Sequence, residues 1–166
     1  MHNVVIINGY GHLGATIAKK LKIHRTYEPV IIENDEDKAV KAQQDGYQVI
    51  HADGSGAKLI KTFYERGNIA AMLTLRSSDI DNIYFILNAK SVYAESIVYS
   101  RMNQVALRPQ YEATKVDGVV EPYAVVDTKA FNYLKKHSEE EKKKISFFGY
   151  THKSIQICKS LKKERI

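Results

Sequence analysis

The stretch Val4-Val5-Ile6-Ile7-Asn8-Gly9-Tyr10-Gly11-His12-Leu13-Gly14 decides the fold of this chain of 166 residues. Its run of four apolar residues predicts a buried strand that ends at Asn8. Three glycines follow, and the residues after Gly11 have the apolar spacing of an amphipathic helix. A strand, a glycine turn and a helix in this order present backbone N–H groups and a helix N-terminus to a phosphate.

An acidic residue extends this pattern. A second β-branched run, residues 30–33, ends in Glu33, nineteen residues after Gly14. A carboxylate at this place can accept hydrogen bonds from both hydroxyls of an adenosine ribose, and it repels a 2′-phosphate. The pattern therefore predicts an adenosine site that disfavours NADP. The alternatives are a glycine turn that binds nothing and a solvated acid at the end of a strand.

Strand-like runs alternate with helix patterns along the chain, which favours a parallel sheet because each parallel connection needs a crossover. The predicted fold is α/β, a Rossmann-like doubly wound parallel sheet of about six strands with helices on both faces. Polar clusters at residues 34–37 and 77–79 are predicted helix caps. The predicted strands are 4–8, 30–33, 48–51, 69–75, 96–100 and 118–120, and the predicted helices are 11–22, 38–44, 57–66, 80–92, 110–115 and 123–137. A polar connector, 24–28, is expected before the second strand, closed by Pro29.

Composition excludes several classes of protein. The net charge is +6, but residues 135–166 hold ten Lys/Arg and four Asp/Glu, so the rest of the chain is neutral. A basic tail with a Lys/Glu helix pattern is typical of a solvated face, so we expect no nucleic-acid partner. The single cysteine, Cys158, fits a reducing cytoplasm. No apolar run approaches the roughly 18 residues of a membrane span, and no secretory signal is present.

Strand ends supply further candidate residues. After the third strand, Asp53 can accept a hydrogen bond from an amino group and Gly54 leaves room for a ring; the alternative is a capping turn. Arg76 and Arg101 follow the next two strands, where they meet phosphates or remain surface cations. His12 either contacts phosphate or is solvated. No metal-ligand spacing and no nucleophile with a base partner is found, so no metal or catalytic residue is predicted. The predicted nucleotide-binding residues are Gly9, Tyr10, Gly11, His12, Leu13, Gly14, Glu33, Asn34, Asp53, Gly54, Arg76 and Arg101.

Residues 3–137 resemble the RCK domain, the regulator of potassium conductance, also called the TrkA N-terminal domain. The most specific parts are the glycine loop, Glu33, the Gly-Tyr-x-Val-Ile-x-x-Asp run at residues 46–53, and Asn82 in the long helix. The resemblance implies a cytoplasmic regulatory domain at the inner face of the membrane, partnered by the pore of a potassium channel or transporter. It also implies a homodimer that assembles into a ring and binds NAD, ATP, ADP or AMP at the glycine loop.

Two departures from the family pattern affect the expected ligand. The position of His12 is often an arginine that reaches terminal phosphates, so we expect NAD(H), AMP or ADP ahead of ATP. The acid-rich turn that is usual after the fourth strand is replaced by Arg76-Ser77-Ser78. This turn adds positive charge and hydroxyls beside the predicted site, which can alter the choice of ligand.

The C-terminal part has two readings. We divide the chain into the RCK-like domain, 1–137, and a charged linker with a strand–helix segment, 138–166. Residues 145–154 are similar to a degenerate copy of the opening motif, with Thr151 and Ser154 in place of glycines. They are either the start of a second RCK-like domain that binds no nucleotide, or a terminal hairpin that completes a dimer interface. The helix 123–137 is the candidate connection between subunits or lobes.

Three functional hypotheses follow. The favoured one is a non-enzymatic gating module, in which nucleotide occupancy is transmitted through a dimer or ring to a pore. The second is a fragment of an NAD-dependent oxidoreductase, which needs a substrate lobe, although only 29 residues follow His137. The third is an oligomerisation module with an empty cleft.

Overall fold

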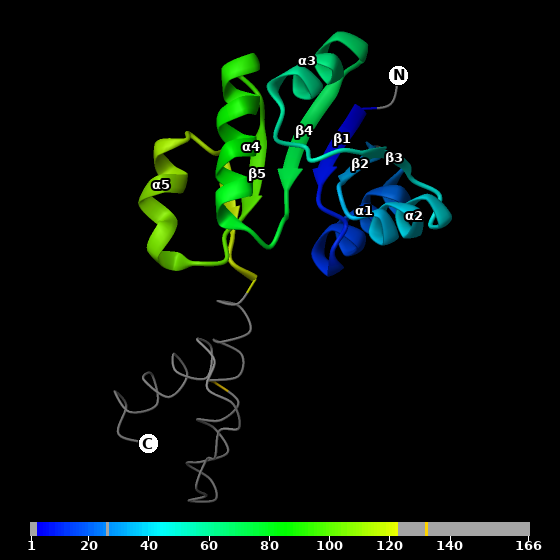
Figure 1. The fold of residues 1–166 in the computed structure, drawn as a ribbon, viewed down its shortest axis with the longest axis horizontal. Coiled ribbons are helices and arrows are strands. Elements are labelled where there is room, and N and C mark those ends of the chain that lie inside the picture. Colours follow the sequence, from blue (N-terminus) through cyan, green and yellow to red (C-terminus); the bar gives the residue numbers. More distant parts are fainter. Residues whose placement is uncertain (1–2, 26, 123–131, 133–166) are drawn as a thin grey trace, which may run out of the picture. The chain divides into compact units, whose positions relative to one another are not determined.

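The computed structural model of the protein describes residues 3–25, 27–122 and 132. These residues form one sheet with helices on both sides (Figure 1). The strands are β1 (Asn3–Asn8), β2 (Tyr27–Glu33), β3 (Gln48–His51), β4 (Ile69–Thr74), β5 (Val98–Arg101) and β6 (Gly118–Val120); the helices are α1 (His12–His24), α2 (Glu36–Gln44), α3 (Ala57–Arg66), α4 (Asp79–Val92), the 3-10 helix η1 (Val105–Leu107) and α5 (Arg108–Ala113).

All strand pairs in the sheet are parallel, and the strand order is β3-β2-β1-β4-β5-β6. The chain builds outward from β1 to β3 and then returns to add β4 on the other side of β1. The order therefore reverses between β1 and β4, which is where open α/β sheets bind their ligands at the carboxyl edge. The predicted Rossmann-like doubly wound sheet is confirmed.

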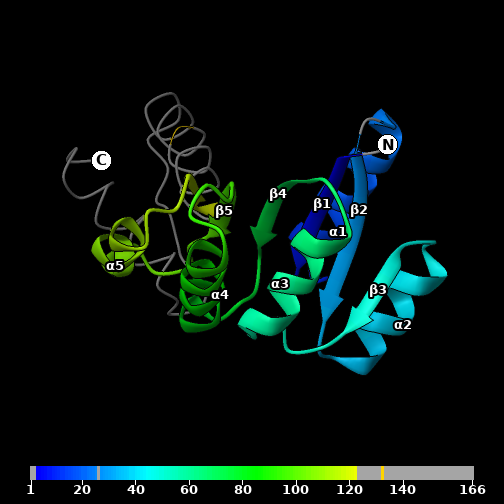
Figure 2. The ribbon, with the colours of Figure 1, turned by 90° about the horizontal axis from the view of Figure 1, so that it is seen from above.

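Two apolar cores lie on the two faces of the sheet, because successive side chains of a strand point to opposite faces. On one face Val5, Ile7 and Ile31 pack with Ala18 of α1 and Ala42 of α2. Helices α3, α4 and α5 cover the other face, with α3 and α4 side by side (Figures 1 and 2). This second core includes Ile6, Ile32, Ile60, Met72, Phe85 and Tyr111.

The strand β2 begins earlier than the sequence predicts. The expected polar connector closed by Pro29 is wrong at its end, because β2 starts at Tyr27 and Pro29 pairs with Val5. The carbonyl oxygens of Ile32 and Glu33 accept hydrogen bonds from the β1 side and the β3 side, respectively. Backbone groups of residues an even number of positions apart in a strand point to the same neighbour. Pro29 is four residues before Glu33, so its nitrogen also faces the β3 side. Since β3 pairs with β2 only from Val30 onward, no ladder hydrogen bond is lost.

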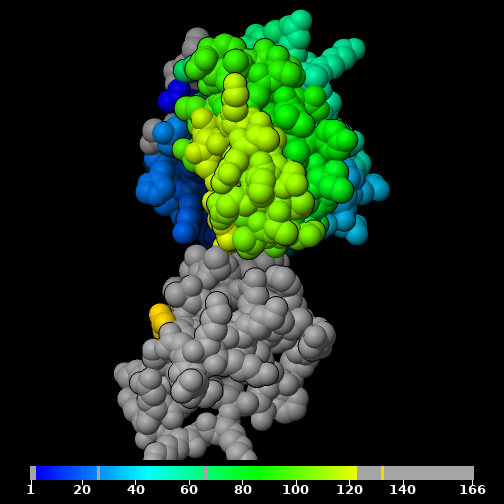
Figure 3. Space-filling view, turned by 90° about the vertical axis from the view of Figure 1, so that its left-hand side faces the viewer, coloured from blue at the N-terminus to red at the C-terminus, as the bar shows by residue number. Residues whose placement is uncertain are grey.

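Helix α5 is fastened to the start of α4 by a buried carboxylate. Side chains of α5 form the yellow-green surface beside the green α4 in Figure 3. The Tyr111 hydroxyl donates to Asp79 Oδ1 at 2.7 Å, and Asp79 also accepts the backbone N–H groups of Asn103 and Gln104 at 2.8 and 3.0 Å. Burial and the hydrogen bond to Asp79 raise the pKa of Tyr111 well above its ordinary value, so the hydroxyl stays a donor.

We expect Tyr111→Phe to lower the free energy of unfolding by about 1–2 kcal/mol, because the buried Asp79 carboxylate loses one of its donors. Urea denaturation measures the change. The matched control is Tyr84→Phe, since Tyr84 is on the exposed side of α4 with 58% of its surface accessible. Equal stabilities of the two variants would contradict a structural role for the Tyr111 hydroxyl.

The chain divides into two compact units, residues 1–120 and 121–166, and the described residues fall almost entirely in the first. Apart from Asn132, the predicted helix 123–137 lies outside the described residues, as do the segment 145–154, Cys158 and the predicted domain boundary, so these remain predictions. In the part of the chain that is described, no helix has both the length and the apolar character needed to cross a membrane.

Candidate nucleotide-binding site

The glycine loop between β1 and α1 has three different structural requirements. Gly9 has φ +106°, in the left-handed region that favours glycine, and its N–H donates to the Ile32 carbonyl at 2.9 Å. A Cβ at Gly14 would overlap the carbonyl oxygen of Gly9. A Cβ at Gly11 would meet nothing within 4 Å. Gly9 and Gly14 are therefore required by the loop itself, whereas Gly11 leaves open space at the N-terminus of α1.

Helix α1 begins without a side-chain cap. Its N-cap residue, Gly11, provides no capping hydrogen bond, and the first turn contains no acidic residue. By contrast, Asp35 caps α2 by accepting the N–H of Lys38, and Ser78 caps α4 by accepting the N–H of Asp81. The first-turn N–H groups of α1 and the positive end of its dipole therefore remain without a protein side chain to compensate them. This arrangement suits an anionic group placed beside Gly11.

Glu33 is buried at the end of β2, with 6% of its surface accessible. Its Oε2 accepts the backbone N–H of Tyr10 at 2.7 Å, and Oε1 accepts the N–H groups of Asn34 and Asp35 at 2.9 and 3.0 Å. The carboxylate thus fastens the glycine loop to the turn after β2. The alternative of a solvated acid at this position is wrong, and the predicted contact with a ribose stays a prediction.

A buried polar chain, which sequence reasoning missed in part, runs from β1 to α4. Asn8 donates to Thr74 Oγ1 at 3.1 Å, and Thr74 donates to Asn82 Oδ1 at 2.7 Å. Asn82 Nδ2 donates to the carbonyl oxygens of Arg76 and Arg101, both at 3.0 Å. This series of hydrogen bonds therefore fixes the backbone at the ends of β4 and β5. The sequence signals were Asn8 at the end of the first apolar run and Asn82 in the long helix, whereas Thr74 lies inside an apolar run and gave no signal.

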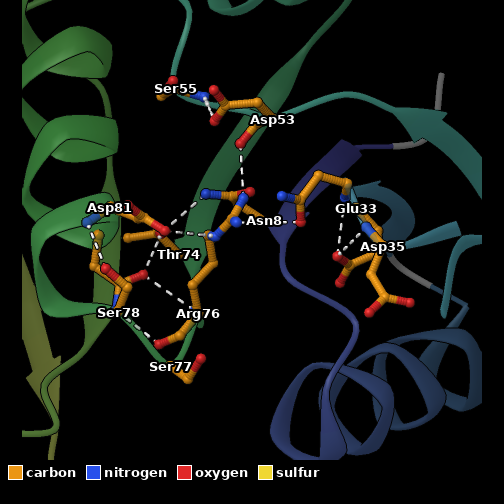
Figure 4. Close-up of polar contacts among 12 residues, drawn as sticks. Asn8, Glu33, Asp35, Asp53, Ser55, Thr74, Arg76, Ser77, Ser78 and Asp81 are labelled. Carbon is orange, nitrogen blue, oxygen red and sulfur yellow. Dashed lines mark hydrogen bonds and ion pairs between the residues drawn. The ribbon is translucent and has the colours of Figure 1, made fainter.

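Arg76 lies across the carboxyl edge of the sheet (Figure 4). Its Nη1 donates to the Asp53 carbonyl oxygen at 2.8 Å, and its Nη2 donates to Asn34 Oδ1 at 3.1 Å. Its Nε lies 3.3 Å from Asp81 Oδ2, and only 16% of the Arg76 side chain is accessible. The alternative of a surface cation is therefore wrong for Arg76.

The turn after β3 differs in detail from its prediction. Gly54 has φ +80°, and a Cβ there would overlap Asn8 Oδ1 and lie 3.2 Å from Ile32 Cγ2. The space beside Gly54 is therefore filled by β1 and β2 side chains, so a close approach explains this glycine instead of the expected room for a ring. Asp53 is exposed, and its Oδ1 accepts the N–H of Ser55 at 3.3 Å.

The other predicted residues lie around the same edge of the sheet. His12 is exposed at the first position of α1, and Leu13 and Arg101 are half-buried. Tyr10 is buried, and its hydroxyl donates to Asp45 Oδ2 at 2.7 Å, which joins the glycine loop to the end of α2. Burial and this hydrogen bond raise the pKa of Tyr10. Among the described residues, no cluster of three or more His, Cys, Asp or Glu side chains could hold a metal ion.

The sequence model described as the TrkA-N domain matches residues 5–122, which is more than half of the chain. Among curated proteins, no sequence matches this chain.

Three solved structures illustrate the similarity of fold. The NAD(P)-binding domain of an exopolyphosphatase-related protein from Archaeoglobus fulgidus has a TM-score of 0.66 and 17% identity, covering 82% of this chain and 99% of that one. The TrkA-N domain of inner membrane protein ybaL from Escherichia coli has a TM-score of 0.70 and 12% identity, covering 81% and 98%. The GsuK channel bound to ADP has a TM-score of 0.80 and 16% identity, covering 100% of this chain and 42% of the channel chain.

Proposed function

The chain belongs to the TrkA-N domain family, and from this premise we propose that it is a nucleotide-binding regulatory domain of a potassium channel or transporter. The observation that carries the proposal is the open side of Gly11 at the uncapped N-terminus of α1, next to the Glu33 carboxylate. Phosphates lie against the glycine loop, and the ribose hydroxyls face Glu33. Arg76 and Arg101 supply positive charge at the same edge of the sheet.

We infer that the ligand is an adenine nucleotide. GsuK has been solved with NAD and with ADP, and these are the first ligands to test here. A 2′-phosphate next to the buried Glu33 carboxylate is disfavoured by charge, which argues against NADP. The side chain of His12 is shorter than the arginine that reaches terminal phosphates in the family. We therefore expect NAD(H), AMP or ADP as the ligand rather than ATP.

The regulatory part of the proposal concerns partners. We propose that the domain forms a homodimer or a larger ring at the inner face of the membrane and acts on a pore subunit or pore domain. A nucleotide can drive such a change only if it binds the two states of the assembly with unequal affinity. The chain spans 42% of the length of the GsuK channel chain.

Titration calorimetry on the 166-residue chain tests the binding part. We expect ADP and NAD to bind, and NADP to bind at least about tenfold more weakly than NAD, because the 2′-phosphate lies beside a carboxylate of low accessibility. Mass spectrometry of nucleotide released from the purified protein identifies the resident ligand. Absence of binding for every adenine nucleotide, with none released, would overturn the proposal. Equal affinity for NAD and NADP would overturn the role of Glu33.

A further inference from the structure

The Arg76 side chain occupies the adenosine half of the proposed site. The carbon stem of Arg76 starts over the glycine loop, since a Cβ at Gly9 would lie 3.3 Å from Arg76 Cγ. The guanidinium then reaches Asn34, the residue after Glu33, and Asp53, the residue two positions after β3. These contacts hold the guanidinium against the residues that follow β2 and β3. A nucleotide whose ribose approaches Glu33 must therefore displace the Arg76 guanidinium.

Displacement has a cost that depends on the ligand. The guanidinium would lose a hydrogen bond of 2.8 Å and one of 3.1 Å in a part of the molecule that is only 16% accessible at this side chain. A phosphate provides acceptors that match the planar guanidinium and form charge-assisted hydrogen bonds stronger than neutral ones. An uncharged nucleoside provides no such acceptor. The stem starts over Gly9, beside the loop where the phosphates are proposed to lie, so pairing with phosphate requires only that the outer torsions of Arg76 rotate.

We propose that Arg76 makes this site selective for phosphorylated adenosine, by occupying its adenosine half in the free protein and pairing with phosphate in the bound one. The inference rests on the proposed nucleotide-binding function. The Asp81 carboxylate lies 3.3 Å from Arg76 Nε, at the end of the stem, and is the contact about which the guanidinium turns in this proposal. A ligand must therefore displace Arg76, and a phosphate group offsets the cost of this displacement by pairing with the guanidinium.

The test compares ADP with adenosine on the full chain. In Arg76→Met we expect ADP to bind about tenfold more weakly and adenosine to bind more tightly, so that the ratio of the two affinities falls by more than about tenfold. Arg76→Lys keeps the charge but loses the planar fork, so an intermediate ratio is expected. The matched control is Arg25→Met, because Arg25 is an exposed arginine at the C-cap of α1.

The outcomes separate the two proposals. A wild-type protein that binds ADP, with an unchanged ratio in Arg76→Met and Arg76→Lys, would overturn the selectivity and leave the function standing. A wild-type protein that binds no nucleotide would overturn both. Thermal unfolding without ligand gives an independent readout. Arg76→Met should lower the midpoint because three contacts are lost, whereas Arg25→Met should not. An unchanged midpoint in Arg76→Met would contradict the proposal that the Arg76 contacts hold its guanidinium in the adenosine half of the site in the free protein.

Discussion

The Gly11→Asp variant is expected to lose nucleotide binding and to keep the stability of the wild-type protein. Gly11 has φ −76°, and no atom lies within 4 Å of a Cβ at this position, so the backbone accepts the new residue without strain and its Cβ overlaps nothing. Its carboxylate is placed at the N-cap of α1, where it can accept the N–H groups that a phosphate would use. It also repels phosphate. We expect the affinity for ADP to fall at least about 100-fold, the effect of losing two hydrogen bonds to a charged group.

Calorimetry and urea denaturation on the same preparation check this prediction. The unfolding free energy should be unchanged, or higher by at most about 1 kcal/mol, because aspartate caps a few tenths of a kcal/mol better than glycine and its charge favours the positive end of the helix dipole. Gly11→Ala adds only a methyl group and should weaken ADP binding less than the aspartate does. Gly67→Ala serves as a remote control, since Gly67 is extended backbone with nothing within 4 Å. If Gly11→Asp kept the affinity of the wild-type protein for ADP, the phosphate would not bind at the N-terminus of α1.

The arrangement of the sheet could be predicted because it depends on local patterns. The four consecutive apolar residues after Asn3 predict a strand that is buried on both faces of its sheet. Since strands alternate with helices along the chain, a parallel sheet with helices on both faces is the arrangement that buries it. The caps Asp35 and Ser78 were also predictable, because a short polar side chain before a helix satisfies its first N–H groups. The error at Pro29 arose because the cost of a proline depends on the neighbouring strand, which only the sheet order reveals.

The polar contacts of the candidate site were far less predictable. Asn8 and Thr74 are 66 residues apart, and Arg76 and Asn34 are 42 apart, yet both pairs are joined by hydrogen bonds. Which side chains meet at the carboxyl edge depends on strand register and on rotamers. Sequence reasoning therefore located the strand ends and their charged residues. It could not show that Glu33 is held by backbone N–H groups or that Arg76 bridges two strand ends.

Gly54 illustrates the same limit on a smaller scale. A glycine after a strand is compatible with a ligand, a turn or a close approach, and the sequence does not separate these reasons. In the structure Asn8 Oδ1 lies against Gly54, and among the described residues this oxygen has no hydrogen-bond partner. The identity of residue 54 therefore depends on a side chain 46 positions earlier. The glycine loop itself was easier, since its three positions serve one short turn.

The Gly14→Ala variant is expected to be less stable than the wild-type protein by about 2–3 kcal/mol. Helix propensity alone predicts the opposite sign, since alanine in place of glycine inside a helix is worth about 1 kcal/mol of stabilisation. The added Cβ overlaps the carbonyl oxygen of Gly9. That residue has little room to retreat, because its N–H is bonded to Ile32 and even a Cβ added to it would lie 3.4 Å from backbone atoms of Leu75 and Arg76. Either the loop or α1 must shift, and such overpacking typically costs 1–3 kcal/mol.

Urea denaturation of Gly14→Ala beside Gly11→Ala gives the decisive comparison. The two changes are chemically identical and three residues apart, but only one of them meets an atom within 4 Å. We expect Gly11→Ala to unfold slightly below the wild-type midpoint, because alanine is a poorer N-cap than glycine, and Gly14→Ala to unfold well below both. We also expect Gly14→Ala to lose affinity for ADP, since a displaced Gly9 carries Tyr10 N–H away from Glu33 Oε2, 2.7 Å distant in the wild type. A Gly14→Ala protein as stable as Gly11→Ala would mean that α1 does not contact the loop as closely as the backbone geometry requires.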